Sequence, residues 1–178
     1  MVKNSHDSYG YVSKSLHWLM ALMVVALFSV GAYMVTLDYY SPWYKTLPFY
    51  HKSTGVVVAA LLLLRVLWRL ANLQPQPLPT HTRWEKALAR VAHALIYVLL
   101  CGIVVSGYLI STADGRAISV FDWFSIPAAG ELFLDQARIA GAIHEYLAYG
   151  LMTLVGVHAL GALKHHFIDK DKTLKRML

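Results

Sequence analysis

The sequence predicts an all-α integral membrane protein, a four-helix antiparallel bundle that forms a single domain over residues 1–178. Two observations carry most of this prediction. Charged residues make up only 15% of the chain and hydrophobic residues 57%, whereas about a quarter of a typical soluble domain is charged. Four apolar segments are long enough to cross the ~30 Å hydrocarbon core of a bilayer as helices, over residues 16–37, 50–71, 87–112 and 141–167.

The first segment, residues 16–37, has no internal charge and carries His17 in its first turn. It is longer than the apolar core of a signal peptide, and residues 35–38 lack the small side chains of a cleavage site. We therefore expect this segment to be retained as a membrane helix.

The second segment, residues 50–71, opens with His51 and ends with Arg65 and Arg69. Long cationic side chains near the end of a membrane helix can extend to the polar interface. The proline-rich stretch 74–80 follows, and prolines at this density end a helix and favour an extended connector.

The third segment, residues 87–112, carries His93, and the longest loop, 113–140, comes after it. Within that loop we expect the aromatic stretch 120–124 to lie at the membrane interface over the outer end of the bundle. The fourth segment, 141–167, contains no proline, so it can form one uninterrupted helix.

Lysine and arginine are distributed unevenly between the two ends of the predicted bundle. Twelve of the sixteen lie in the N-terminal stretch, the second connector and the C-terminal end, and four lie in the first and third loops. The positive-inside rule then places both termini in the cytoplasm. Because the basic residues flank apolar segments and form no basic stripe, the net charge of +6 reflects membrane topology and not nucleic-acid binding.

Four histidines fall at two predicted depths. His144 and His158 are fourteen residues apart, nearly four helical turns, so they project from almost the same face about 21 Å apart along the axis. In an antiparallel bundle His17 shares the inner depth with His158, and His51 shares the outer depth with His144. The sequence therefore predicts an inner and an outer histidine pair, each contributed by two helices.

Paired imidazoles on facing helices suit a flat, iron-containing group held in a bundle core. A b haem takes two axial ligands without thioether attachment, and the chain lacks the Cys-x-x-Cys-His motif of c-type attachment. Its single cysteine, Cys101, excludes an intrachain disulfide and a cysteine-based zinc or iron–sulfur site. The pattern favours two haem b groups, with His17 and His158 on the inner iron and His51 and His144 on the outer iron.

The spacing alone leaves several alternatives open. His93 also lies near the inner depth and could replace His17 or His158, or meet a propionate or a quinone. Arg65 and Arg69 could bind haem propionates, but they serve equally well as determinants of topology. The histidines could instead line a pathway for metal transport, in which case the purified protein would be colourless.

Six short motifs, each weak alone, surround these histidines and arginines. They are Ser-Leu-His-Trp-Leu at 15–19, His-Lys-Ser-Thr-Gly at 51–55, Arg-x-x-x-Arg at 65–69 before the prolines, His-Ala-Leu-Ile-Tyr at 93–97, Ile-His-Glu at 143–145, and Val-His-Ala at 157–159 with His-His-Phe at 165–167. Taken together, they resemble the bacterial cytochrome b561 family, four-helix di-haem b proteins of the inner membrane, over nearly the whole chain.

This resemblance implies that His17, His51, His144 and His158 are the axial ligands and that His93 is not. It implies a multi-pass protein of the bacterial inner (plasma) membrane, embedded in lipid, that transfers electrons between a donor on the outer side and the quinone pool. An oxidoreductase that oxidises superoxide and reduces ubiquinone is the first activity it suggests. The alternative is a cytochrome b membrane anchor that relays electrons between quinone and a partner dehydrogenase or hydrogenase.

Superoxide is an anion, and guiding it to a site requires local positive charge. The outer segments hold four basic residues against six acidic ones, so their net charge is negative. Lys52, next to His51, and Arg138, just before the fourth segment, are therefore the candidate cationic guides.

Overall fold

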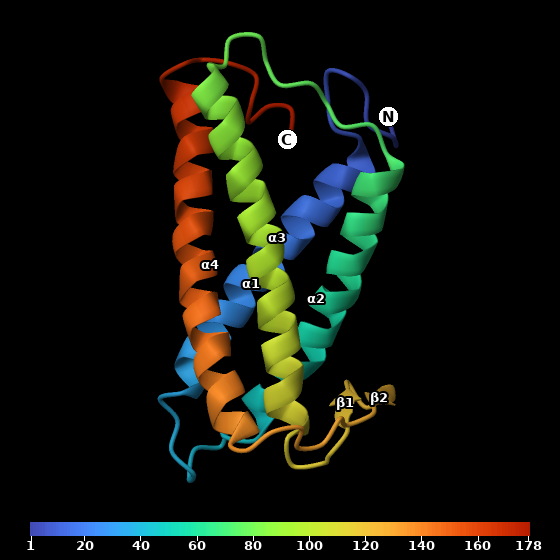
Figure 1. Ribbon diagram of the computed structural model, residues 1–178, viewed down its shortest axis with the longest axis vertical. Helices are drawn as coiled ribbons and strands as arrows, with labels where there is room; N and C mark the ends of the chain where they lie inside the picture. The colour runs from blue at the N-terminus through green and yellow to red at the C-terminus, as the bar shows by residue number, and fades with distance from the viewer.

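The computed structural model describes residues 1–178 and confirms a bundle of four membrane-length helices (Figure 1). The helices are α1 (Tyr11–Met34), α2 (Thr46–Ala71), α3 (Arg83–Thr112) and α4 (Gln136–Phe167), and the strands β1 (Ile118–Val120) and β2 (Phe124–Ile126) form a small antiparallel hairpin. Both chain termini lie at one end of the bundle (Figure 1), which we call the inner end; the hairpin lies at the other, the outer end.

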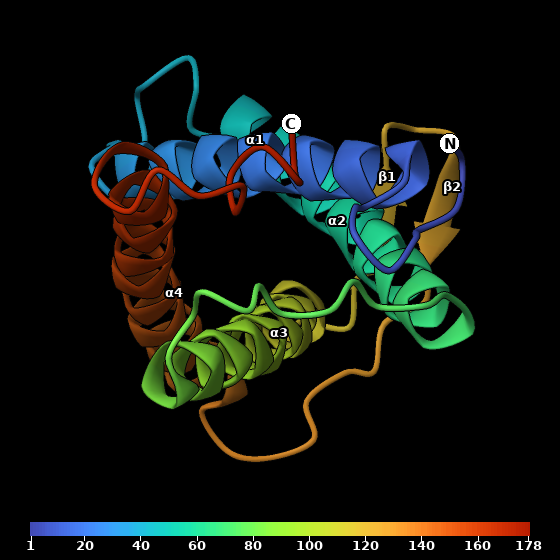
Figure 2. The same cartoon turned by 90° about the horizontal axis from the view of Figure 1, so that it is seen from above.

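The helices pack in two neighbouring pairs around a common axis. α3 packs along α4 and α1 packs along α2, whereas α1 and α4 meet over a short stretch; viewed along the axis, the four helices surround the centre of the bundle (Figure 2). One buried apolar side chain from each helix, Met20, Leu62, Leu100 and Leu151, forms the central cluster. This cluster forms an apolar layer at mid-depth.

The outward faces of the helices are apolar. Leu22, Val98 and Leu160, for example, are each largely exposed on helices of high mean hydropathy. Contiguous apolar surface of this extent is unfavourable in water and is expected where helices contact lipid. The chain is thus a multi-pass membrane protein.

All four helices begin four or five residues earlier than the apolar segments suggested, and polar residues fix the earlier starts of α3 and α4. The Thr82 hydroxyl accepts a hydrogen bond from the Glu85 amide, and the Glu85 carboxylate accepts one from the Thr82 amide, a capping box that starts α3 at Arg83. At the start of α4, the buried Gln136 donates to the carbonyl of Leu109 and accepts from the amide of Leu132. This glutamine therefore fixes the end of the long loop against α3.

The expected aromatic stretch in the long loop is part of the β1–β2 hairpin. Ser53, fully buried in α2, holds the hairpin in place: its hydroxyl donates to the carbonyl of Ser119 and accepts from the amide of Phe121. Phe121 and Asp122 adopt positive φ angles in the connecting turn. Since Ser53 lies two residues after His51, the hairpin is anchored next to the outer histidine pair.

At the inner end, the C-terminal tail folds back over the start of α1. The Trp18 indole donates to the carbonyl of Met177 at 2.8 Å, and the Lys14 ammonium donates to the carbonyl of Leu178 at 3.1 Å. The tail therefore covers the inner end of the bundle next to His17.

Candidate functional site

The structure brings the predicted histidine pairs together at two depths. At the outer end, the rings of His51 (α2) and His144 (α4) have centroids 6.3 Å apart and an interplanar angle of 68°. At the inner end, His17 (α1) and His158 (α4) have centroids 6.4 Å apart at 69°. Two pairs with nearly the same geometry thus lie on either side of the mid-depth apolar cluster.

This spacing fits a metal ion between the two imidazoles of each pair. A nitrogen–metal bond is about 2 Å long, and the centre of the imidazole ring lies about 1 Å behind its nitrogen. Two imidazoles on opposite sides of one metal therefore have centroids about 6 Å apart. The separations of 6.3 and 6.4 Å agree with this value.

The environment of the outer pair leaves the coordinating nitrogens available. His144 Nδ1 lies 2.9 Å from the carbonyl oxygen of Ile103 and 3.2 Å from the hydroxyl of Ser106. Donation from Nδ1 to that carbonyl leaves the lone pair on Nε2, the tautomer that ligates metal. The Nδ1 atom of His51 is buried and has no hydrogen-bond partner, an unusual state that points to a missing ligand.

Two glycines provide room beside the outer rings. A Cβ atom at Gly31 would lie 3.3 Å from Cε1 of His51, and one at Gly107 would lie 3.1 Å from Cε1 of His144. Both distances are shorter than an ordinary carbon–carbon contact. Gly31 lies fourteen residues after His17 on α1, so α1 presents an imidazole at the inner site and bare backbone at the outer one.

The inner pair lies beside a cationic cluster. The Arg65 guanidinium contacts Nδ1 of His17 at 3.0 Å and donates to the Tyr97 hydroxyl at 3.1 Å. A guanidinium can only donate, so this contact places the His17 proton on Nε2. Ligation through Nε2 then requires Arg65 to turn away from His17.

Neither Arg65 nor Arg69 forms an ion pair with a carboxylate, and both guanidinium carbons lie 5.9 Å from the centre of the Tyr97 ring. Uncompensated charge within a membrane bundle is costly. Two arginines without an acidic partner beside the inner pair fit the carboxylates of a porphyrin, as the sequence suggested.

His93 is placed less favourably for ligation than the other candidates. Its ring centroid lies 5.2 Å from that of His158, shorter than the spacing of about 6 Å expected for two imidazoles on opposite sides of a metal. The geometry therefore favours His17 over His93 as the partner of His158.

The two candidate guides differ in their ionic environment. Lys52 is exposed and forms no ion pair, whereas Arg138 pairs with Asp135 at 2.9 Å.

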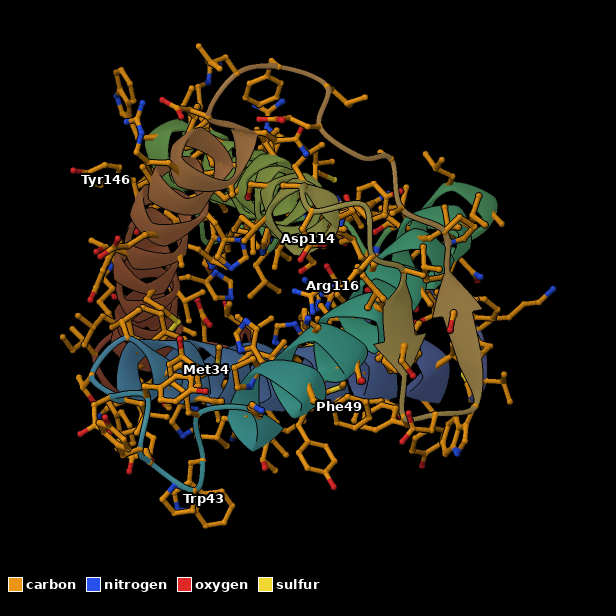
Figure 3. The ribbon with its side chains drawn as sticks, turned by 90° about the horizontal axis from the view of Figure 1, so that it is seen from below. Met34, Trp43, Phe49, Asp114, Arg116 and Tyr146 are labelled. Carbon is orange, nitrogen blue, oxygen red and sulfur yellow. The ribbon has the colours of Figure 1, made fainter.

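Figure 3, a view onto the outer end, places Asp114 and Arg116 toward the middle of the bundle and Tyr146 on its periphery. Arg116 forms an ion pair with Asp114, and its hydrogen bonds lower the pKa of that carboxyl below the usual range.

Sequence reasoning missed three residues that orient the site. Ser106 and the Ile103 carbonyl fix the tautomer of His144, and Tyr97 holds Arg65. Ser106 and Ile103 lie in an apolar run that carries no motif. Tyr97 was noted only as part of the stretch at 93–97, and its pairing with Arg65 depends on how α2 and α3 pack.

Four membrane helices that hold two imidazole pairs at two depths fit a membrane cytochrome of the b type. The comparison with known families agrees: the family model for prokaryotic cytochrome b561 matches residues 8–178. The chain belongs to this family, whose members bind b haem and transfer electrons across the membrane. An oxidoreductase of the bacterial inner membrane fits this family and the four spans.

Three relatives cover nearly the whole chain. "Cytochrome b561 homolog 2" from Escherichia coli (strain K12) is 49% identical over 175 residues, 98% of this chain and 93% of the relative. The "Probable superoxide oxidase CybB" from Yersinia pestis is 32% identical over 174 residues, 97% of each chain. "Cytochrome b561 homolog 1" from Escherichia coli (strain K12) is 26% identical over 163 residues, 92% of each chain.

Proposed function

We propose that this protein holds two b haems, one ligated by His51 and His144 and the other by His17 and His158, and passes electrons between a donor at the outer end and the quinone pool. The observation that carries this proposal is the matched spacing of the two histidine pairs, 6.3 and 6.4 Å between ring centroids. Each haem, when bound, supplies one-electron redox chemistry.

The residues of the chain bind the haems, orient their ligands and exclude water between the two sites. The helices hold the histidines, and the Ile103 carbonyl keeps the Nδ1 proton of His144 in place. Arg65 and Arg69 supply positive charge for the propionates of the inner haem. The apolar cluster around Leu62 and Leu100 excludes water between the two sites, which lowers the dielectric constant there.

Superoxide is the donor that we propose, with ubiquinone as the acceptor. The support is the name of the Yersinia pestis relative, a probable superoxide oxidase. The overall reaction balances when two superoxide anions, one quinone and two protons give two molecules of dioxygen and one quinol. With the outer end on the periplasmic side, as the positive-inside rule predicts, dioxygen would leave there and the electrons would reach the membrane pool.

The test of the donor uses the exposed cations at the outer end. Lys52→Gln should slow haem reduction by superoxide about two- to fivefold at low salt, because an exposed cation attracts an anion. Arg138→Gln should have a smaller effect, since Arg138 already pairs with Asp135. Stopped-flow absorbance after a superoxide pulse measures the rate, and added salt should slow the wild type because it screens charges beyond about 8–10 Å.

Two controls make this result specific. Lys172→Gln, in the tail at the inner end, should leave the rate unchanged, and quinol should reduce the haems of every variant at the wild-type rate. Equal rates for wild type and the Lys52→Gln, Arg138→Gln double variant at every ionic strength would exclude guidance by these residues. No reduction by superoxide at all would exclude superoxide as the donor.

The second candidate function is a membrane anchor that relays electrons for a partner dehydrogenase or hydrogenase. The outer hairpin favours it, because Trp123 and Phe124 are 80% and 52% exposed there and exposed aromatic residues are common in protein interfaces. Co-purification of a larger redox subunit, together with absence of superoxide oxidation, would support this function.

A further inference from the structure

A second group of histidines, separate from the two pairs, lies at the inner end of the bundle. His81 comes from the connector before α3, His165 from the last turn of α4, and Asp171 from the tail. Their side chains are only 15%, 15% and 9% exposed, respectively. The connector and the distant C-terminal region, from the last turn of α4 into the tail, therefore bring two imidazoles and a carboxylate into one largely buried cluster.

The ligand atoms of this cluster converge. Oδ2 of Asp171 lies 2.8 Å from Nε2 of His81 and 3.2 Å from Nδ1 of His165, and the three atoms all lie within 4.8 Å of one another. Around a tetrahedral zinc ion with bonds of about 2.0–2.2 Å, neighbouring ligand atoms are about 3.4 Å apart. The cluster thus has the dimensions of a metal site that needs only small adjustments.

Hydrogen bonding does not account for His165. Its Nδ1 atom is buried and makes no hydrogen bond, although the carboxylate oxygens of Asp169 and Asp171 lie 2.7 and 3.2 Å away. His165 Nδ1 thus lies within ion-pair range of two carboxylates without an aligned hydrogen bond to either. A histidine close to carboxylates is a common setting for a metal ligand.

A hydrogen bond from a neighbouring residue orients the Asp171 carboxylate. The amide of Thr173 donates to Oδ1 of Asp171 at 2.7 Å, which leaves Oδ2 directed at the two histidines.

In a neighbouring group of possible ligands, Lys164 already neutralises the charge of the two carboxylates. Glu85, His165 and Asp169 also lie close together, but the Lys164 ammonium sits 2.9 Å from the Glu85 carboxylate and 2.7 Å from that of Asp169. This lysine supplies the cation that the two acids require, so the free ligand set is His81, His165 and Asp171. A hollow of about 360 Å³ lined by polar residues adjoins the set and gives an ion access from solvent.

We propose that His81, His165 and Asp171 bind one divalent transition-metal ion of the zinc class, with a water molecule as the fourth ligand. Two imidazoles and a carboxylate are ligands that zinc accepts. The ion would join the connector, α4 and the tail. Because the tail also contacts Trp18 and Lys14, metal binding would stabilise the cover over the inner histidine pair.

The test measures zinc on the full-length, haem-loaded protein in detergent. After treatment with EDTA, equilibrium dialysis against ZnCl₂ and elemental analysis should find one zinc per wild-type chain. His81→Gln and Asp171→Asn should each weaken zinc binding by more than about 100-fold, since loss of an orienting neighbour alone costs 10–100-fold. His166→Gln, the matched control next to His165, should bind zinc as the wild type does.

A second measurement reports the structural effect. Zinc should slow amide hydrogen exchange in residues 169–178 of the wild type and of His166→Gln, but not of His81→Gln or Asp171→Asn. An unchanged haem spectrum shows that each variant is folded. The proposal is overturned if the wild type binds no zinc, or if either ligand variant with a normal haem spectrum binds zinc as tightly as the wild type.

Discussion

His51→Ala and His144→Ala will each remove the outer haem and leave the inner one in place. The reason is that each outer ring has one opposing imidazole, at a centroid distance of 6.3 Å, and no other histidine at that depth to replace it. The haem content per chain, measured by the pyridine haemochrome assay, should fall by half. The remaining haem should keep a six-coordinate, low-spin spectrum.

The matched control for these variants is His166→Gln, which removes an imidazole outside both pairs. It should retain the full haem content. The assignment would be wrong if His51→Ala and His144→Ala affected different haems, or if either variant retained two low-spin haems.

His17→Ala and His158→Ala should each remove the inner haem, whereas His93→Ala should leave both haems low-spin. The ring centroids of His17 and His158 are 6.4 Å apart, as ligation of one metal from opposite sides requires, but those of His93 and His158 are 5.2 Å apart. Absorbance and electron paramagnetic resonance spectra of the three variants distinguish the two arrangements. Loss of the inner haem in His93→Ala, with a low-spin inner haem retained in His17→Ala, would reverse the assignment.

Much of the fold could be predicted because the bilayer restricts which structures can span it. Each spanning helix must be long and apolar, so hydropathy locates α1 to α4 to within a few residues. The differences lie at polar helix ends: α3 begins at Arg83 because of the capping box between Thr82 and Glu85. That Thr-x-x-Glu pattern is visible in the sequence and could have moved the predicted start.

The depth of each histidine could also be predicted, since antiparallel spans convert position in the sequence into position along the axis. Which side chains meet at one depth could not, because that depends on how the helices rotate and tilt. The spacing alone therefore leaves His93 as an alternative ligand, and the ring distances favour His17 over it.

Long-range contacts made by the loops and the tail were beyond sequence reasoning. The meeting of His81 with Asp171 across ninety residues leaves no periodic signal, whereas the ion pair of Arg138 with Asp135 has i, i+3 spacing and is visible in the sequence. The role of Ser53 could not be predicted either. Its hydroxyl holds the β1–β2 hairpin, but the sequence shows only a serine in an apolar helix.

The central claim is that four histidines form two haem sites, and haem quantification tests it most directly. Protein purified from membranes in mild detergent should contain two haems per chain, both released by acid–acetone as non-covalent haem b and both six-coordinate and low-spin. One haem per chain, haem that stays covalently attached, or a colourless protein would contradict the account.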